Sequence, residues 1–384
     1  MMNEIYPNYI AWRLSYQCNY RCKACFFSED ALKSVHSGLD PQELLNFLDR
    51  TEKKWRIGIS GGEAFFIKDF LELAEKITRI HQLEINTNLS LTGKINEFSE
   101  RINPKSVPKL IATYHPLDDG ERNRRSTFIQ NYMNLTKKGF TTEAVFVVTP
   151  ERIDLFYELS DEFKTYDISL TPKPFRGIWK GKEYPYAFDH EARKVFATVP
   201  NSTRRIPLNY QGVLCRAGSS CLRIHNDGTI TRCGELPYED YIVNKQVHLG
   251  DTMPTAENTV LGFVSSSPQE ILYSEARPCK SSMCTCFGRH FTVLSSDQKN
   301  FVKGMRNFMK NEYLEAKNFF LKTIEENPTH ASAHNNLGVV YHYLGQSILA
   351  KECFQKSLTL NSRSELFKQN QNSEQPQLTP DVLQ

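Results

Sequence analysis

The feature that most constrains the fold is an alternation of short β-rich runs and helical stretches between residues 9 and 170. Such alternation predicts repeated βα units with a parallel sheet. The first intervening helix has a clear start, with Asp40 at the N-cap, Pro41 at N1 and Glu43 at N3, because these residue types favour helix initiation at those positions. The six predicted strands are 9–15, 55–60, 83–87, 109–114, 143–148 and 167–171.

Six strands with five helices between them, and a sixth helix near 189–199, predict an α/β fold with a partial (β/α)6 TIM-type barrel. A cysteine-rich β-hairpin extension and an all-α repeat pair should follow it. In such barrels the chemistry lies at the C-terminal ends of the strands. The predicted domains are the partial barrel at 1–199, the extension at 200–296, the repeats at 297–362, and a tail at 363–384 whose low apolar content predicts disorder.

Two local patterns support the later domains. In the segment 222–233, Asp227-Gly228 is a turn signal between alternating strand residues. Farther along, three pairs of residues recur at a spacing of 34: Gly304 and Gly338, Ala316 and Ala350, and Phe320 and Phe354. This period resembles a pair of tetratricopeptide repeats, although the first copy departs from the pattern at Lys303 and Asn307. An ordinary pair of helical hairpins is the alternative.

Charge and hydropathy exclude several functional classes. With 47 basic and 44 acidic residues and a net charge of +3, nothing in the charge pattern favours nucleic acid or an anionic membrane as a partner. No run approaches the roughly 20 apolar residues of a membrane span, and the start lacks a signal-peptide pattern. We therefore expect a cytoplasmic protein, in which ten cysteines indicate metal binding, catalysis or burial rather than disulfides.

The first cysteines follow the first predicted strand directly. Cys18, Cys22 and Cys25 form a C-x3-C-x2-C loop, and three thiolates on one loop can hold three corners of a cubane iron-sulfur cluster. One iron then stays open for a substrate or cofactor. The alternative is a zinc knuckle with a fourth ligand from elsewhere, for example His36.

The second predicted strand ends in Gly61-Gly62-Glu63. Two glycines let the backbone approach a ligand closely, and Glu63 offers a carboxylate to an ammonium group. The cysteine loop followed by this segment, each directly after a strand of a partial barrel, resembles the radical S-adenosylmethionine superfamily. That family has both motifs in this order.

The resemblance implies that the three loop cysteines hold a 4Fe-4S cluster whose free iron is chelated by S-adenosylmethionine. Gly61, Gly62 and Glu63 would bind the amino group of the cofactor. The family commonly has an aromatic residue before the third cysteine, but here it is Ala24, so an adenine contact must come from backbone or from Phe26.

Other cofactor-binding candidates follow later strands. Asn86, Thr87 and Asn88 are suitably polar for ribose hydroxyls, or else form a simple strand-end turn. Arg125 stands where related enzymes place an arginine for the cofactor carboxylate, and Arg124 is the alternative.

The family's chemistry is reductive cleavage of the cofactor to a 5'-deoxyadenosyl radical, which abstracts hydrogen from a substrate C–H bond. An electron donor such as flavodoxin or ferredoxin is implied. The sequence assigns no catalytic side chain. His115, at a strand end, is either a site residue or structural.

A second cysteine set lies in the predicted extension. Cys221 and Cys233 should nearly face one another across the hairpin. The region resembles the SPASM extension or its shorter Twitch relative, which implies one auxiliary 4Fe-4S cluster held by Cys215, Cys221, Cys233 and one of the last three cysteines. Two clusters with open sites, or a zinc ribbon, are the alternatives. Cys353 should be a buried small residue. The last three cysteines of this second set are Cys279, Cys284 and Cys286.

These features favour a radical S-adenosylmethionine enzyme that modifies a peptide or protein, as in ribosomal peptide maturation, because a repeat pair offers a groove for such a partner. Only eight residues precede the first strand, so no leader-binding module is expected there. Oxidation, epimerisation or rearrangement of a small natural-product precursor is therefore the alternative. The non-enzymatic alternative is a metal-stapled repeat scaffold.

Overall fold

The first part of the chain is built on a sheet in which six parallel strands follow one another in chain order. The structure is a computed structural model that describes residues 8–22, 25, 39–116, 122–175, 177–184, 187–197, 208–232, 260–279 and 292–383. The strands are β1 (Tyr9–Ser15), β2 (Arg56–Gly61), β3 (Gln82–Thr87), β4 (Lys109–Tyr114), β5 (Thr142–Val148) and β6 (Leu170–Pro174).

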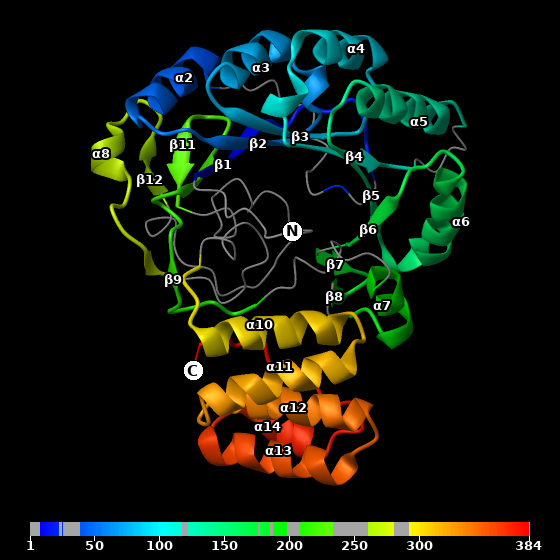
Figure 1. Ribbon diagram of the computed structural model, residues 1–384, viewed down its shortest axis with the longest axis vertical. Helices are drawn as coiled ribbons and strands as arrows, with labels where there is room; N and C mark the ends of the chain where they lie inside the picture. Colours follow the sequence, from blue (N-terminus) through cyan, green and yellow to red (C-terminus); the bar gives the residue numbers. More distant parts are fainter. Residues whose placement is uncertain are drawn as a thin grey trace. The chain divides into compact units, whose positions relative to one another are not determined.

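Five helices alternate with these strands and lie along one side of the sheet (Figure 1). The alternation confirms the predicted α/β fold with a partial (β/α)6 barrel. Asp40 caps α2 as predicted, because its side chain accepts a hydrogen bond from the Gln42 N–H. The helices are α2 (Pro41–Arg50), α3 (Phe70–Thr78), α4 (Thr92–Arg101), α5 (Arg122–Lys137) and α6 (Ile153–Lys164).

The strands divide their side chains between two faces. Trp12, Ile57 and Ile85 are fully or almost fully buried. The residues that alternate with them along β2 and β3 include Arg56 and Glu84, which form a buried ion pair with 3.2 Å between Arg56 Nη1 and Glu84 Oε1. The sheet is therefore apolar on one face and carries buried polar pairs on the other, because successive strand residues point to opposite faces.

Strand β6 begins at Leu170, three residues later than predicted. The intervening residues form a turn, since Asp167 has a φ of 60° and the Ile168 N–H donates to the Phe163 carbonyl of α6. Two short strands, β7 (Gly177–Trp179) and β8 (Lys182–Tyr184), then form an antiparallel pair.

The predicted hairpin is present and extends the barrel sheet. Its strands are β10 (Cys221–Ile224) and β11 (Thr229–Thr231), and Gly228 in the turn has a φ of 85°. Strand β10 pairs in parallel with β1, while β11 pairs with β12 (Val260–Phe263). The sheet order is thus β12-β11-β10-β1-β2-β3-β4-β5-β6, and the short helix α8 (Pro268–Ile271) follows β12.

The chain divides into two units whose bounds differ from the predicted domains. One unit comprises Met1–Phe188 and Arg216–Glu275, and the other comprises Asp189–Cys215 and Ala276–Gln384. The predicted extension is therefore shared between the two units. The reason is strand pairing, because β10 joins the barrel sheet while β9 (Leu214–Cys215) pairs with β13 (Arg277–Pro278).

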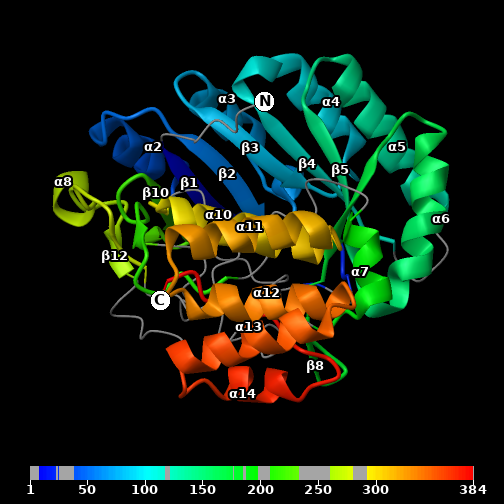
Figure 2. The same ribbon diagram turned by 60° about the horizontal axis from the view of Figure 1, so that its bottom comes forward.

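The second unit contains α7 (His190–Ala197) and a stack of antiparallel helices (Figure 2). A Cβ built on Gly304 or on Gly338 would lie 2.7 Å from the ring of Phe320 or Phe354 respectively. The two copies therefore pack in the same way. Phe320 and Leu337 share a core with Leu208 of the preceding segment. The helices are α10 (Ser296–Met309), α11 (Tyr313–Glu326), α12 (Ala331–Tyr343), α13 (Ser347–Leu360) and α14 (Glu365–Gln371).

The prediction of a disordered tail at 363–384 is wrong for the residues that the structure describes. Helix α14 occupies part of it, and Val382 is fully buried in the core of the repeats. Composition failed here because buried asparagine side chains, together with a few apolar side chains such as Val382, hold this segment.

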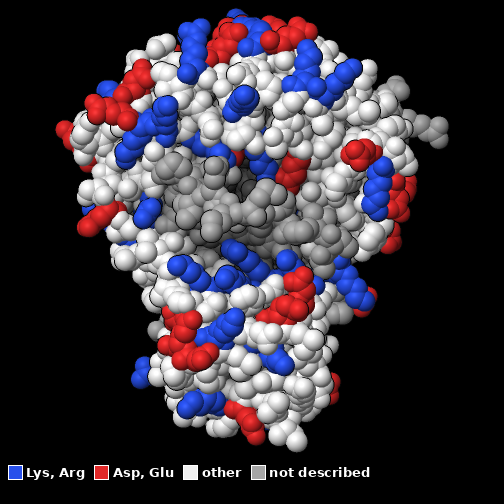
Figure 3. Space-filling view, in the orientation of Figure 1, with Lys and Arg blue, Asp and Glu red and all other residues white. Residues whose placement is uncertain are grey.

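Charged side chains of both signs are intermixed on the face drawn in Figure 3. Among the described ion pairs, Arg101 bonds both Glu75 and Glu97 at 2.7 Å. Exposed ion pairs of this kind add little stability each. In the described residues, no helix has the length and apolar character that crossing a membrane requires.

Candidate functional site

The three predicted cluster ligands follow the C-terminal end of β1. Cys18, Cys22 and Cys25 are half-buried and form no disulfide. The Tyr20 N–H donates to Cys18 Sγ at 3.4 Å, and the Cys25 N–H donates to the Cys22 carbonyl at 3.0 Å. These bonds turn the loop back on itself, so that the cysteines stay at the edge of the sheet where chemistry is expected.

The thiols interact electrostatically. The pKa of Cys22 is raised to about 12, mainly by burial and to a lesser extent by Cys25 and Cys18, while Arg152 and Arg124 oppose the shift. Burial also raises the pKa of Cys18. Without a metal, Cys18 and Cys22 are therefore protonated at neutral pH, and a metal would displace their protons on binding. Within the described ranges, which omit 23–24 and 26–38, no three Cys, His, Asp or Glu side chains are arranged to hold a metal ion.

Gly61 and Gly62 lie against the start of this loop. The Gly62 N–H donates to the Ser15 carbonyl at 2.8 Å. A Cβ on Gly61, whose φ is 132°, would lie 2.0 Å from the Ser15 oxygen, and one on Gly62 would lie 1.8 Å from the Gln17 oxygen. Both positions require glycine because the protein's own backbone fills the space of a side chain, a reason that differs from the predicted approach of a ligand.

Glu63 is buried and bonded on both carboxylate oxygens. Oε1 accepts from Thr87 Oγ1 at 2.7 Å and from the Phe65 N–H at 3.2 Å, and Oε2 accepts from the Asn88 N–H at 2.6 Å. Burial nevertheless raises its pKa to about 7, because these bonds offset only part of the desolvation. Among the described contacts, the hydrogen bonds of the Glu63 carboxylate link the C-terminal end of β2 to that of β3.

Asn88 connects the β3 end to the cysteine loop. Its Nδ2 donates to Asn19 Oδ1 at 3.0 Å, and its Oδ1 accepts from Ser90 Oγ at 2.6 Å. Ser90 Oγ also accepts from Asn19 Nδ2 at 2.8 Å. The Asn86 side chain, in contrast, donates to the Ile59 carbonyl at 2.8 Å and so links β3 to β2. Asn88 therefore belongs to the polar network beside the cysteines.

The two arginines at the start of α5 have different surroundings. The guanidinium of Arg124 lies 4.7 Å from the ring centroid of Tyr20, in the cysteine loop. Arg125 Nη1 bonds Glu162 of α6 at 2.5 Å, and its Nε donates to the Tyr114 hydroxyl at 3.4 Å. Arg124 rather than Arg125 is thus the arginine beside the loop.

His115 directly follows β4. Burial, assisted by the Arg152 charge, lowers its pKa to about 4. His115 is therefore neutral at physiological pH. Arg152 ends the short helix η3 (Pro150–Arg152) after β5 and acts electrostatically on both His115 and Cys22.

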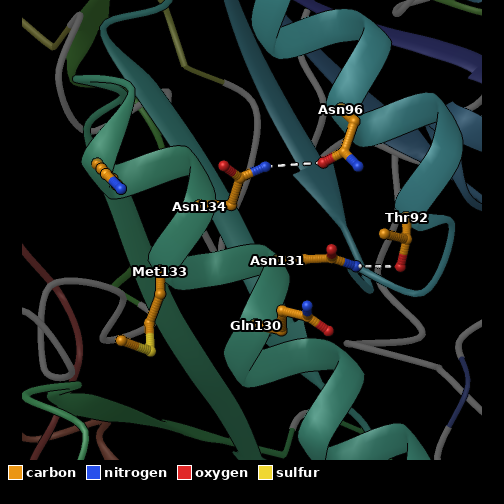
Figure 4. Close-up of a pocket in the computed structure, with 7 residues that line it drawn as sticks. Thr92, Asn96, Gln130, Asn131, Met133 and Asn134 are labelled. Carbon is orange, nitrogen blue, oxygen red and sulfur yellow. Dashed lines mark hydrogen bonds between the residues drawn. The ribbon is translucent and has the colours of Figure 1, made fainter.

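A surface pocket of about 490 Å³ lies between α4 and α5 (Figure 4). Asn131 Nδ2 bonds both Thr92 Oγ1 and the Leu89 carbonyl, and Asn134 Nδ2 bonds Asn96 Oδ1. Leu89 has a φ of 54°, so the Asn131 bond fixes a left-handed turn directly after Asn88. None of the predicted cofactor or metal ligands lines this pocket.

The described cysteines of the second set belong to different units. Cys215 in β9 pairs with Arg277, and the Cys279 N–H donates to the Val213 carbonyl at 2.7 Å. Cys279 therefore lies on the same face of this ladder as Cys215, as a diagonal neighbour at about 7–8 Å. Cys353 is half-buried in α13.

Cys221 belongs to the other unit and pairs with Tyr9, at the start of β1. The loop cysteines follow the opposite end of that strand, about 20 Å away at 3.3 Å per residue. The described hairpin register pairs Arg223 with Thr231, but Cys233, Cys284 and Cys286 lie outside the described residues. The facing of Cys221 and Cys233 thus stays a prediction.

The sequence interpretation missed three residues of this site: Asn19, Tyr20 and Arg152. Asn19 and Tyr20 stand between the first two cysteines, and Arg152 follows β5 closely. Position was the available signal, since all three follow strand ends. Asn19, for example, bonds Ser90, which lies 71 residues away in the chain. Local sequence patterns do not reveal a partner at that separation.

A partial (β/α)6 barrel with a three-cysteine loop after β1 and Gly-Gly-Glu after β2 is the arrangement typical of radical S-adenosylmethionine enzymes. Among known proteins, the chain is similar to the mycofactocin maturase MftC of Mycolicibacterium smegmatis, with 25% identity over 194 residues that cover 46% of this chain and 47% of that protein. The chain thus spans about half the length of this relative. The family model of the tetratricopeptide repeat matches residues 331–364.

Two solved structures are also similar. Native anSMEcpe with bound AdoMet and Cp18Cys peptide has a TM-score of 0.48 and 15% identity, covering 83% of this chain and 98% of that chain. Streptococcus suis SuiB bound to precursor peptide SuiA has a TM-score of 0.46 and 13% identity, covering 70% and 65%. The comparisons confirm the predicted resemblance to radical S-adenosylmethionine enzymes and to tetratricopeptide repeats.

Proposed function

We propose that this chain is a radical S-adenosylmethionine enzyme whose cofactor site lies at the C-terminal ends of β1, β2 and β3. The observation that carries the proposal is the network in which Asn19 of the cysteine loop, Glu63 after β2 and Asn88 after β3 are joined by hydrogen bonds. Motifs that are distant in the sequence thereby meet at one edge of the sheet.

The three loop thiols are the ligand type that an iron-sulfur cluster takes, although their side chains do not converge on one metal position in this structure. Cys18, Cys22 and Cys25 are partly accessible thiols on one loop, and Arg124 and Arg152 favour the thiolate form of Cys22. When bound, a 4Fe-4S cluster with S-adenosylmethionine supplies one-electron reductive cleavage and hydrogen abstraction. A flavodoxin or ferredoxin would be a suitable electron donor.

The chain's own residues would bind and orient the cofactor. The backbone of Gly61 and Gly62 lies beside the loop and offers carbonyl groups to an ammonium group. Glu63 would fix that backbone relative to Asn88. Arg124, beside Tyr20, is better placed for a carboxylate than Arg125, which bonds Glu162. Asn86 and Asn88 remain the proposed ribose contacts.

A test uses protein reconstituted anaerobically with iron and sulfide, then treated with dithionite and S-adenosylmethionine. Wild type should release 5'-deoxyadenosine and methionine, and Cys22→Ala should release neither. Cys353→Ala is the matched control, since it removes a half-buried thiol from a repeat helix and should keep activity. Bound zinc in place of iron, or unchanged activity of Cys22→Ala, would refute the proposal.

We further propose that the substrate is a peptide or protein. The support is the similarity to a protein named a maturase, together with a repeat module that can engage a polypeptide. Peptides encoded beside the gene should stimulate 5'-deoxyadenosine release and change in mass. If only small natural-product precursors do so, the peptide assignment fails.

We also propose one auxiliary 4Fe-4S cluster with Cys215 and Cys279 among its ligands. Their position on one face of the β9–β13 ladder supports this. Replacing both with Ala should remove about four iron atoms per chain, the content of one such cluster, while the Cys353→Ala control keeps its iron. Unchanged iron in the double variant would contradict the assignment.

A further inference from the structure

Residues 375–383 lie extended against the repeat helices, held by asparagine side chains. Asn335 and Asn336 of α12 and Asn370 of α14 are at most 2% exposed. All three direct their amides at this segment or at one another. Figures 1 and 2 both mark the end of the chain near one end of α12.

Two of the asparagines each bind both main-chain groups of one residue. Asn370 Oδ1 accepts from the Gln377 N–H at 2.8 Å, and its Nδ2 donates to the Gln377 carbonyl at 2.7 Å. Asn336 Oδ1 accepts from the Thr379 N–H at 2.8 Å, and its Nδ2 donates to the Thr379 carbonyl at 3.0 Å. Asn335 Nδ2 adds a third bond to the Gln377 carbonyl at 3.2 Å.

The other edge of the segment is paired as a strand would be. The Asn209 N–H donates to the Pro380 carbonyl at 2.9 Å, and the Val382 N–H donates to the Asn209 carbonyl at 3.0 Å. The polar contacts of Gln377 and Thr379 with the helices are made through their main chain, and the Gln377 side chain is exposed, whereas the Val382 side chain is buried in the core of the repeats. Main-chain recognition of this kind tolerates different side chains, as in strand addition.

We propose that this face of the second unit is a binding site for an extended peptide, that residues 375–383 are its resident occupant, and that an extended segment of a partner polypeptide exchanges with them. Buried asparagine amides left without partners would be costly, so an empty site is disfavoured. A second extended chain offers the same N–H and C=O groups and restores these bonds one for one. The inference does not depend on the proposed function.

The short link between α14 and residues 375–383 determines how strongly this segment competes with a free peptide for the site. Residues 372–374 link α14 to the segment, and a link this short gives an effective concentration in the millimolar range, on the order of 1 mM. A free peptide that binds the open site at about 1–10 μM would therefore bind the intact chain about 100- to 1,000-fold more weakly. Removal of the segment should expose the site.

The experiment compares the intact chain with a chain ending at Asn372, using a fluorescein-labelled peptide of residues 373–384 as the probe. The shortened chain should bind the probe at least about 100-fold more tightly than the intact chain. A probe carrying Gln377→Pro should bind at least 10-fold more weakly, because proline has no N–H to donate to Asn370. A probe carrying Gln377→Ala is the matched control and should bind normally.

Several outcomes would overturn the proposal: a folded shortened chain that ignores the probe at 1 mM, or equal binding of the proline and alanine probes. If the shortened chain does not fold, hydrogen exchange in the intact chain decides. Exchange of the Gln377 and Thr379 amides at least 100-fold faster than that of the buried α12 amides supports exchangeability. Equal protection would mean that the segment is a fixed part of the core.

Discussion

Glu63 provides a prediction whose magnitude follows from its surroundings. Its carboxyl is fully buried, and burial raises its pKa from 4.5 to about 7. A carboxyl with a raised pKa binds more protons in the folded state than in the unfolded state between these two values. The folded chain therefore loses stability as the pH rises from 4.5 to about 7. The contribution of protonated Glu63 to the free energy of unfolding is greatest below pH 4.5.

The Glu63→Gln variant cannot titrate and should lack this dependence. Since one pKa unit corresponds to 1.36 kcal/mol, the wild type should lose about 2–3 kcal/mol of unfolding free energy relative to Glu63→Gln between pH 5 and pH 8. Subtracting the two proteins at each pH cancels other titrating groups. The difference between the two pH values is the measured quantity.

Urea denaturation followed by tryptophan fluorescence suits this measurement, because all three tryptophans, Trp12, Trp55 and Trp179, belong to the first unit. The signal therefore reports the unit that contains Glu63. Equal pH dependence of the two proteins would refute the reasoning, as would a wild type that gains stability relative to Glu63→Gln above pH 5.

Three further predictions concern packing and the site. Gly62→Ala should destabilise the first unit by about 3 kcal/mol in urea denaturation, since the added Cβ would lie 1.8 Å from the Gln17 oxygen. Gly93→Ala is the control and should not destabilise it, because no described atom beyond its own helix lies within 4 Å of a Cβ there. Gly338→Ala should lower the unfolding temperature of the second unit by circular dichroism, because its Cβ meets Phe354 at 2.7 Å, and leave the tryptophan transition unchanged. Arg124→Ala should reduce 5'-deoxyadenosine formation at least about 10-fold. Arg125→Ala should cost about 1 kcal/mol of stability or less and keep activity, since it breaks a partly exposed ion pair and one long hydrogen bond to Tyr114; equal losses of activity would contradict this distinction.

Local patterns in the sequence predicted the elements of the fold well. Five of the six predicted strands begin within one residue of the observed ones, and Asp40 caps its helix. Such features depend on residues a few positions apart, so propensity and periodicity capture them. The sixth strand moved because the left-handed Asp167 prolongs the turn after α6, and a strand propensity does not reveal that.

The candidate site was predicted by residue type but not by contact. The sequence identified Glu63 and Asn88, whereas only the folded chain shows the bond between them. It also left Arg124 and Arg125 as alternatives. Adjacent helical residues point about 100° apart, so the tertiary placement of α5 decides which of the two faces Tyr20.

By itself, the sequence determined the βα alternation, the cysteine loop, the Gly-Gly-Glu segment and the 34-residue repeat. Each of these is either a contiguous motif or a regular period, so it can be recognised without knowledge of tertiary contacts. The tertiary structure decided that β10 pairs with β1 and that residues 375–383 are ordered against α12 and α14. Both depend on hydrogen bonds between groups far apart in the chain. Asn336 and Thr379 are 43 residues apart, and buried asparagine amides stabilise a polar segment that composition alone would leave disordered.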